Sequence, residues 1–265
     1  MKLFIPALAL VLFSQNIHAQ DGIPDSSFSQ DGQATFSLNT EERANAGVVL
    51  PNGKIMAAGF STQSAKKEAM LTRINEDGSL DTSFANAGFK IQTIRGSAND
   101  QILDMVRQPN GKLLVCGFSG GLSDTLLFVA RFNAGGSLDA SFATNGIFLD
   151  NSVGISRRGQ VMYLQPDGKI LVGGISNSSL ENDILLLRLD STGVPDASFG
   201  TGGYFIANTL AGDEAVNGIA MQNSGKIIVS INTPQLNFVT GRLLVNGQID
   251  NTYGNSGWAT YTFSS

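Results

Sequence analysis

The feature that most constrains this chain is an internal repeat of about 57 residues. The motif Asp-x-Ser/Thr-aromatic occurs five times, at spacings of 56, 58, 57 and 54 residues. Its members are Asp25 and Phe28, Asp81 and Phe84, Asp139 and Phe142, Asp196 and Phe199, and Asp250 and Tyr253. A fixed period over the whole chain indicates a repeat architecture, in which each unit is one supersecondary structure.

Two further signatures recur in step with this motif. One is a turn glycine followed by lysine, at Gly53, Gly111, Gly168 and Gly225. The other is a single arginine in an apolar run, at Arg73, Arg131, Arg188 and Arg242. Together they divide the chain into four units, about 25–80, 81–138, 139–195 and 196–249, and a partial unit, 250–265.

Each unit predicts four antiparallel strands. In the first unit, Gly47–Leu50 and Lys54–Phe60 flank Asn52-Gly53, the sequence typical of a type I′ hairpin turn. Ala69–Ile74 and a segment near Phe89–Ile94 follow as the third and fourth strands. Both faces of such a sheet are apolar, so it must be buried between copies of itself. The pattern predicts an all-β fold, a β-propeller of four-stranded antiparallel blades.

The strand count leaves the closure of the ring open. An extra strand at Trp258–Phe263 gives 17 strands, whereas a closed ring of four four-stranded blades needs only four per blade. The ring is therefore closed with one redundant strand, or it is open or truncated. Contact between a strand at Gln33–Leu38 and the fourth unit would identify a closed ring.

The residues also resemble a known family. The pattern PDGKILVGG followed by LLLRLDSTGVPDASFGTGG, within residues 166–203, is similar to the delta-60 repeat of bacterial proteins. The resemblance covers residues 22–257 and implies a secreted or surface propeller, with no activity assigned. The fourth unit departs from the pattern at Asn223-Ser224-Gly225 and at Tyr253.

The N-terminus has the pattern of an export signal. Met1-Lys2 precedes an apolar run at Leu3–Phe13 and a small-residue cleavage site at Ile17-His18-Ala19. A membrane anchor is the alternative, but the run is shorter than the ~20 residues that span a bilayer. We expect residues 1–19 to be a signal peptide, residues 20–265 to be the propeller domain, and the location to be secreted, cell-surface or periplasmic without membrane insertion.

Composition excludes several function classes. His18 is the one histidine and lies in the predicted signal peptide, so the mature chain has no Ser-His-Asp triad and no histidine metal ligand. The chain has 17 basic and 22 acidic residues and no basic cluster, which argues against nucleic acid as a partner. We expect no cofactor and assign no catalytic residue.

The stretch NEDGSLDTSF, residues 75–84, raises the possibility of a calcium site. Asn75, Asp77 and Asp81 place oxygen atoms around Gly78, whereas calcium needs six to eight oxygen ligands in register. The other copies keep the glycine and the last aspartate but not the other acids. We therefore interpret the stretch as a structural turn at the seam between one blade and the next.

The remaining repeated residues have structural interpretations. A charge in an apolar strand needs a partner, so we expect each arginine to pair with the aspartate of the motif, as Arg131 with Asp139. The alternative is a ring of arginines that binds anions in a central channel. We expect the motif phenylalanines to be buried anchors, and Cys116, which aligns with Ala58, Gly173 and Ser230, to be a core thiol.

Charged residues also cluster in the connections between units. They are Glu41 and Glu42, Asp100 and Asp104, Arg157 and Arg158, and Asp213 and Glu214. We interpret them as solvated loop charge, with paired carboxylates for glycoside chemistry as the alternative. Because these loops differ most between units, they predict a scaffold that binds a protein or a glycan, or alternatively a carbohydrate-active enzyme with its carboxylates on this face.

Overall fold

The computed structural model describes residues 23–38, 41–96, 98–121, 124–152, 154–177, 181–208, 212–233 and 238–261. These residues form 16 β-strands in four four-stranded antiparallel sheets. No helix among them is long and apolar enough to cross a membrane. The predicted all-β fold of four-stranded blades is confirmed. The predicted signal peptide lies outside the described residues.

Each sheet consists of four consecutive strands. The first contains β1 (Glu42–Val49), β2 (Ile55–Gln63), β3 (Lys66–Ile74) and β4 (Phe89–Gln92). The second contains β5 (Asp100–Arg107), β6 (Leu113–Ser119), β7 (Leu126–Phe132) and β8 (Ile147–Leu149). The third contains β9 (Ser156–Leu164), β10 (Ile170–Asn177), β11 (Asp183–Leu189) and β12 (Tyr204–Ala207). The fourth contains β13 (Ala215–Met221), β14 (Ile227–Asn232), β15 (Phe238–Leu243) and β16 (Trp258–Tyr261).

The predicted hairpin between β1 and β2 is present, but its turn differs from the expected type I′. Val49 pairs with Ile55, and the Leu50 N–H donates to the Lys54 carbonyl at 2.7 Å. Of the turn residues 51–53, only Gly53 has a positive φ, 77°, as in three-residue hairpin loops that end in a left-handed residue. In the first sheet, a turn with two positive φ angles occurs instead at Ser64-Ala65, between β2 and β3.

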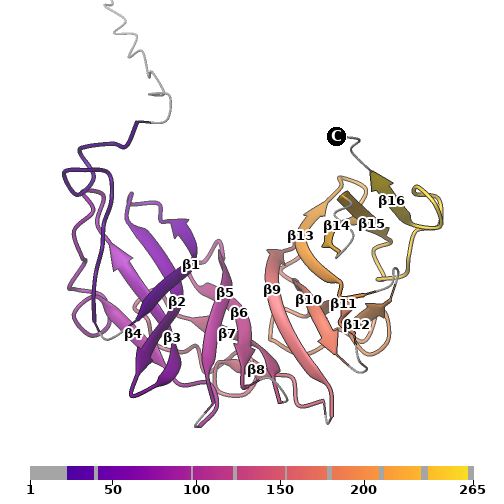
Figure 1. Ribbon diagram of the computed structural model, residues 1–265, viewed down its shortest axis with the longest axis horizontal. Helices are drawn as coiled ribbons and strands as arrows, with labels where there is room; N and C mark the ends of the chain where they lie inside the picture. Colours follow the sequence, from indigo (N-terminus) through magenta and orange to yellow (C-terminus); the bar gives the residue numbers. More distant parts are fainter. Residues whose placement is uncertain are drawn as a thin grey trace, which may run out of the picture.

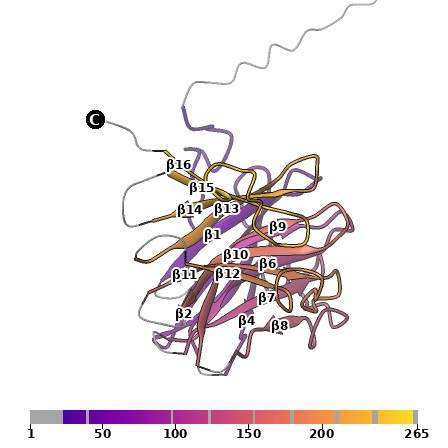
Figure 2. The same cartoon turned by 90° about the vertical axis from the view of Figure 1, so that its right-hand side faces the viewer.

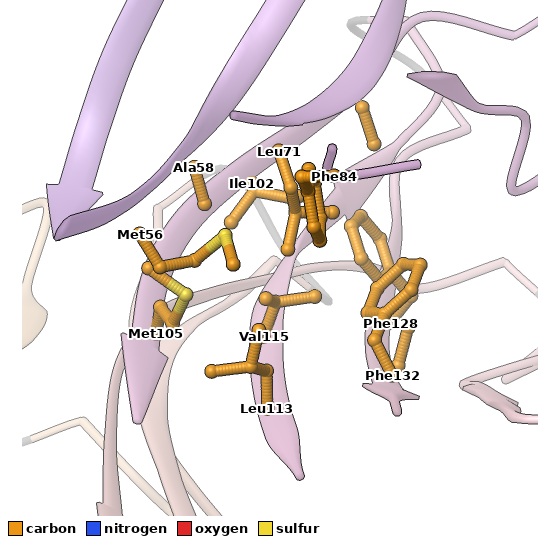
Figure 3. Packing of buried hydrophobic residues seen from close by; sticks show 12 residues of the cluster. Met56, Ala58, Leu71, Phe84, Ile102, Met105, Leu113, Val115, Phe128 and Phe132 are labelled. Carbon is orange, nitrogen blue, oxygen red and sulfur yellow. The ribbon is translucent and has the colours of Figure 1, made fainter. Parts of the chain in front are cut away.

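The sheets pack face to face in chain order and form an open arc (Figure 1). The first strands of successive sheets contact one another, β1 with β5, β5 with β9, and β9 with β13. An apolar cluster fills each of the three spaces between successive sheets. Figure 3 shows the first of these, where Met56 and Leu71 of the first sheet face Met105 and Val115 of the second.

The arc does not close into a ring, because the first and fourth sheets lie apart at its two ends (Figure 1). The strand expected at Gln33–Leu38 is not formed. In a closed ring this segment would pair with β15 as an outer strand, but β16 already holds that edge. Trp258–Tyr261 is thus the fourth strand of the fourth sheet, and the described residues have 16 strands rather than the expected 17.

The expected seam between blades also lies elsewhere. Residues 75–84 connect β3 to β4 inside the first sheet, and the equivalent stretches connect the third and fourth strands of the other sheets. The chain passes from one sheet to the next later, after the outer strand. The repeat motif therefore belongs to the interior of each blade.

Candidate functional site

The strands of all four sheets begin and finish at two opposite sides of the arc, and these two sides differ in character. The first side, here called the motif end, contains the β1–β2 hairpin and the β3–β4 connection of each sheet. The second, here called the loop end, contains the β2–β3 connections and the connections between sheets. Because antiparallel strands alternate in direction, all repeated turns lie at the motif end and all variable connections lie at the loop end.

At the motif end, one aspartate in each sheet pairs with a lysine and an arginine. Asp139 Oδ2 lies 2.6 Å from Arg131 Nε and 2.7 Å from Lys112 Nζ, and its Oδ1 accepts from Ser141 Oγ at 2.8 Å. The same arrangement recurs at Asp81 with Arg73 and Lys54, Asp196 with Arg188 and Lys169, and Asp250 with Arg242 and Lys226. The predicted pairing of arginine with aspartate is present. The alternative of unpaired arginines around an anion channel is wrong.

These contacts lower the carboxylate pKa values. The lysine hydrogen bonds hold the pKa of Asp81, Asp139 and Asp250 well below its usual range, with the serine or threonine and the arginine contributing. For Asp196, burial acts in the opposite direction, but hydrogen bonds from Ser198 and Lys169 outweigh it and the pKa is again low. The lysine that follows every turn glycine was recognised as part of the repeat, but its bond to the aspartate was not predicted.

The motif phenylalanines link neighbouring sheets. The Phe142 ring is fully buried, and the Arg131 guanidinium lies over it, 4.6 Å from its centroid. Its outer edge meets Gly193 in the turn of the next sheet, where any side chain would collide with the ring. Phe84 and Phe199 are equally buried, as expected. Phe28 and Tyr253, at the two ends of the arc, are only half-buried.

The possible calcium ligands are bound by the chain itself. Asp77 Oδ1 accepts from the Ser79 N–H at 2.9 Å and from Ser79 Oγ at 2.6 Å. Both oxygens of Asp81 are held by Lys54, Arg73 and Ser83. These bonds make the stretch a self-contained turn. Cys116 is fully buried, and burial raises the pKa of its thiol, so it is a core residue as expected.

The loop end contains a repeated feature that the sequence interpretation missed. Glu42, Asp100, Arg157 and Glu214 occupy equivalent positions at the start of the first strand of each sheet. Asp100 is 0 %, Glu214 1 % and Arg157 7 % exposed. The expectation of solvated loop charge is therefore wrong for these three. Local composition does not reveal burial of this kind.

Three of these residues lie opposite a serine of the second strand. Glu42 pairs in register with Ser61, Asp100 with Ser119, and Arg157 with Ser176. Ser61 Oγ donates to Glu42 Oε1 at 3.2 Å, and Arg157 Nε donates to Ser176 Oγ at 3.3 Å. The missed signal is this serine, which recurs at the period of the repeat.

In the third sheet this position holds an arginine instead of a carboxylate, and a nearby aspartate neutralises its charge. Arg157 Nη1 lies 2.8 Å from Asp150 Oδ2, and both side chains are almost fully buried. The Tyr204 ring lies beneath the guanidinium at 4.6 Å, and its hydroxyl donates to Asp150 at 3.2 Å. Burial raises the pKa of Tyr204. The group is a buried ion pair with its polar atoms in use, not a solvated charge.

A polar pocket opens at the loop end between the second and third sheets. It has a volume of about 270 Å³ and is lined by Thr125, Gly154, Ser156, Arg158, Ile175, Asn177 and Asn182. None of these is acidic. The Arg158 guanidinium lies over the Phe118 ring, 4.7 Å from its centroid, and forms no ion pair with a carboxylate in the described part of the chain.

The set of side chains that lines this pocket does not recur at the equivalent positions of the other sheets. Residues equivalent to Arg158 are Arg43 in the first sheet, Gln101 in the second and Ala215 in the fourth, and the residue equivalent to Asn177 in the second sheet is Gly120. Asn182 is held from the next connection, because its N–H and its amide both donate to Asp213 at 2.9 Å. The pocket thus combines a cation, amides and hydroxyls that the scaffold does not require.

One comparison with known protein families supports the fold. A family model described as a domain of unknown function (DUF5122), a beta-propeller, matches residues 50–84, 108–142 and 165–199. Among solved structures, the chain is similar to MPT-4, a mannose phosphorylase from Leishmania mexicana in complex with phosphate ion. That similarity has 13% sequence identity and a TM-score of 0.37, and covers 77% of this chain and 68% of the other. No curated protein matches the chain.

Proposed function

We propose that this protein is a secreted or cell-surface binding scaffold of delta-60 type, and that the polar pocket at the loop end binds a glycan that carries a carboxylate group. The observation that carries the proposal is Arg158, a half-buried cation without an acidic neighbour in the lining of its pocket. A planar guanidinium binds a carboxylate through two parallel hydrogen bonds. The amides and hydroxyls around it suit sugar hydroxyl groups.

The rigid frame beneath the pocket favours a binding role. Arg158 is fixed by the Phe118 ring, and Asn177 donates to Asn182 Oδ1 at 3.0 Å. Side chains ordered before the ligand arrives lose less conformational entropy on binding. In many binding proteins, loops that vary in sequence carry the polar binding groups, and a rigid scaffold holds these loops in place.

A carbohydrate-active enzyme is the alternative, but this pocket does not support it. Glycoside hydrolysis generally uses two carboxylates about 5–10 Å apart in one cleft. No carboxylate belongs to the described residues that line the pocket. Asp213 accepts two hydrogen bonds from Asn182, at 2.9 Å, and Asp150 is paired with Arg157. The proposal therefore assigns binding and no reaction.

The test is calorimetric titration of the chain, without its predicted signal peptide, with oligogalacturonate and with its neutral methyl ester. We expect binding of the acid, little binding of the ester, and a loss of roughly tenfold or more in affinity for Arg158→Gln, as expected for a charge-assisted hydrogen bond.

Arg43→Gln is the matched control, because Arg43 is the equivalent residue of the first sheet and is exposed. It should bind like the unchanged chain. Equal binding of acid and ester, or equal losses in the two variants, would contradict the proposed pocket. Release of reducing sugar by the unchanged chain would favour the enzyme.

A further inference from the structure

The two ends of the arc each carry a copy of the repeat motif. In residues 250–257 the Gly257 N–H donates to the Tyr253 carbonyl at 2.8 Å, and Gly254 has a φ of 53°. In residues 25–32 the Gly32 N–H donates to the Phe28 carbonyl at 2.7 Å, and Ser29 has a φ of 52°. The N-terminal copy is therefore folded like the others. Unlike them, it does not connect two strands of a sheet within the described residues.

Within the arc, each motif packs on the β3–β4-type turn of the following sheet. The surface of this turn that receives the motif is here called the seat. At two of the three junctions the residue after the aromatic donates its N–H to a turn carbonyl, Ala143 to Thr192 at 2.7 Å and Gly200 to Asn246 at 2.8 Å. At the first junction, Phe84 and Ala85 lie against Gly136 of the turn. The arginine beside the motif donates to the carbonyl one residue earlier, as Arg131 Nη1 to Ser191 at 2.7 Å. Sheet-to-sheet contact thus includes a repeated main-chain junction.

On the first sheet, this seat is occupied by residues 25–32. The Ser29 N–H donates to the Asp77 carbonyl at 2.8 Å, and Asp77 is the equivalent of Thr192 and Asn246. Asp25 is exposed, and its carboxylate accepts hydrogen bonds from the N–H and the hydroxyl of Ser27. Within the described chain no lysine or arginine pairs with Asp25. The N-terminal copy therefore holds the seat without the two cations that fix the other copies.

The fourth sheet shows the opposite situation, because no turn in the described part of the chain covers the surface that would pack against a following sheet. Phe238 is 53 % exposed, whereas its equivalents Ala69, Leu127 and Ile184 are fully buried by the next sheet. The Tyr261 ring lies 6.1 Å from that of Phe238 and is also exposed. Gly254, whose N–H would reach a following turn, is exposed as well. Figure 2 turns this end of the arc toward the viewer.

We propose that the fourth sheet of one copy docks on the first sheet of a second copy, and that residues 25–32 block this junction by occupying its seat. A second copy is the occupant because the two surfaces are the two halves of an interface that the chain already makes three times. Two such junctions would join two arcs into one closed assembly of eight sheets, within the range of known propellers.

The experiment is to release the seat in the chain without its predicted signal peptide and to measure mass by light scattering over a concentration series. Ser29→Pro removes the N–H that binds Asp77 and is incompatible with a φ of 52°. We expect the unchanged chain to be a monomer and Ser29→Pro to double in mass with increasing concentration. Thr35→Pro, in the exposed extended part of the same segment, should remain a monomer.

A second substitution tests the geometry of the junction. Gly136, the equivalent of Gly78, leaves no room for a side chain beside the Phe84 ring, so a side chain at Gly78 would meet Tyr253 of a docking copy. Asparagine tolerates the positive φ of this turn. Adding Gly78→Asn to Ser29→Pro should restore the monomer.

Three results would overturn the proposal. They are an unchanged chain that already associates, a folded Ser29→Pro variant that stays monomeric at every concentration, and an association that Gly78→Asn does not reverse. Deletion of residues 20–32 releases the same seat without adding a proline, and decides the question if Ser29→Pro does not fold.

Discussion

The motif end and the loop end of the sheets use charge in opposite ways. At the motif end, four sheets keep the same aspartate, arginine and lysine in the same geometry. At the loop end, the equivalent position at or beside the start of each first strand is Glu42, Asp100, Arg157 or Glu214, and the last three are buried. One end repeats its chemistry and the other changes even the sign of its charge.

This difference shows what the shared frame requires. At the motif end each aspartate bonds inside its own sheet while the arginine beside it reaches the turn of the next, so a change would disturb two sheets. At the loop end, Arg157 is balanced by Asp150 from the connection that immediately precedes it. A connection that supplies its own counter-charge can change without its neighbours, which explains why the pocket at Arg158 lies there.

The largest expected effect concerns the aromatic anchor of the motif end. Phe142→Ala should lower the free energy of unfolding by about 3–5 kcal/mol, because it leaves a cavity between two sheets. Phe28→Ala removes the same side chain from a half-buried copy and should lose about 1 kcal/mol or less. Urea denaturation measures both, and equal losses would mean that burial by the next sheet does not matter.

The next effect concerns the shared aspartate and its dependence on pH. Asp139→Asn should lose about 2 kcal/mol at pH 7, because it weakens charge-assisted bonds from Lys112 and Arg131. The folded pKa of Asp139 is lowered, so its contribution is present above the unfolded pKa of about 3.9 and is lost as pH falls below it. The difference between variant and parent should shrink in that range. A difference independent of pH would contradict the ion pair.

A smaller effect should come from the reversed charge at the loop end. Asp150→Asn leaves Arg157 buried without its counter-charge, and replacing Arg157 by Gln in addition removes that charge. Because the two groups are in direct contact, we expect a coupling energy of about 1–2 kcal/mol in the double-mutant cycle. Additive losses, measured by the same denaturation, would show that the pair is not the unit we describe.

The smallest effect is expected at Asp100. Burial raises the pKa of this carboxyl, so its folded pKa exceeds the unfolded one, and ionisation weakens the fold as pH rises through this interval. Asp100→Asn keeps an oxygen that can accept from the Ile94 N–H, as Asp100 does at 2.7 Å. The free energy of unfolding at pH 7 should change by no more than about 0.5 kcal/mol. A loss as large as that of Asp139→Asn would mean that both ends use their carboxylates alike.

Much of the frame could be predicted from the sequence, because its signals are local and repeated. The turn glycines place the hairpins, although the turn in the first sheet is not the expected type I′. One arginine in an apolar strand requires a nearby acid, and the pairing of Arg131 with Asp139 was expected for that reason. The sequence interpretation failed where the result depends on a neighbouring sheet. Asp100 looks like a loop residue in its own segment, but it starts β5, which packs between the first and third sheets, and it is fully buried. Gln33–Leu38 has the alternation of a strand but lacks an edge to join.

The lysine, arginine and aspartate of the motif end also have a consequence for how the chain folds. In the second sheet, the members of this contact lie between Lys112 and Asp139, separated by 27 positions. The contacts that stabilise one sheet lie among its own residues, so they do not depend on distant parts of the chain. Short sequence separations between contacting residues favour fast folding. Each sheet can therefore form soon after its own residues leave the ribosome, and the arc can grow by adding one finished sheet at a time.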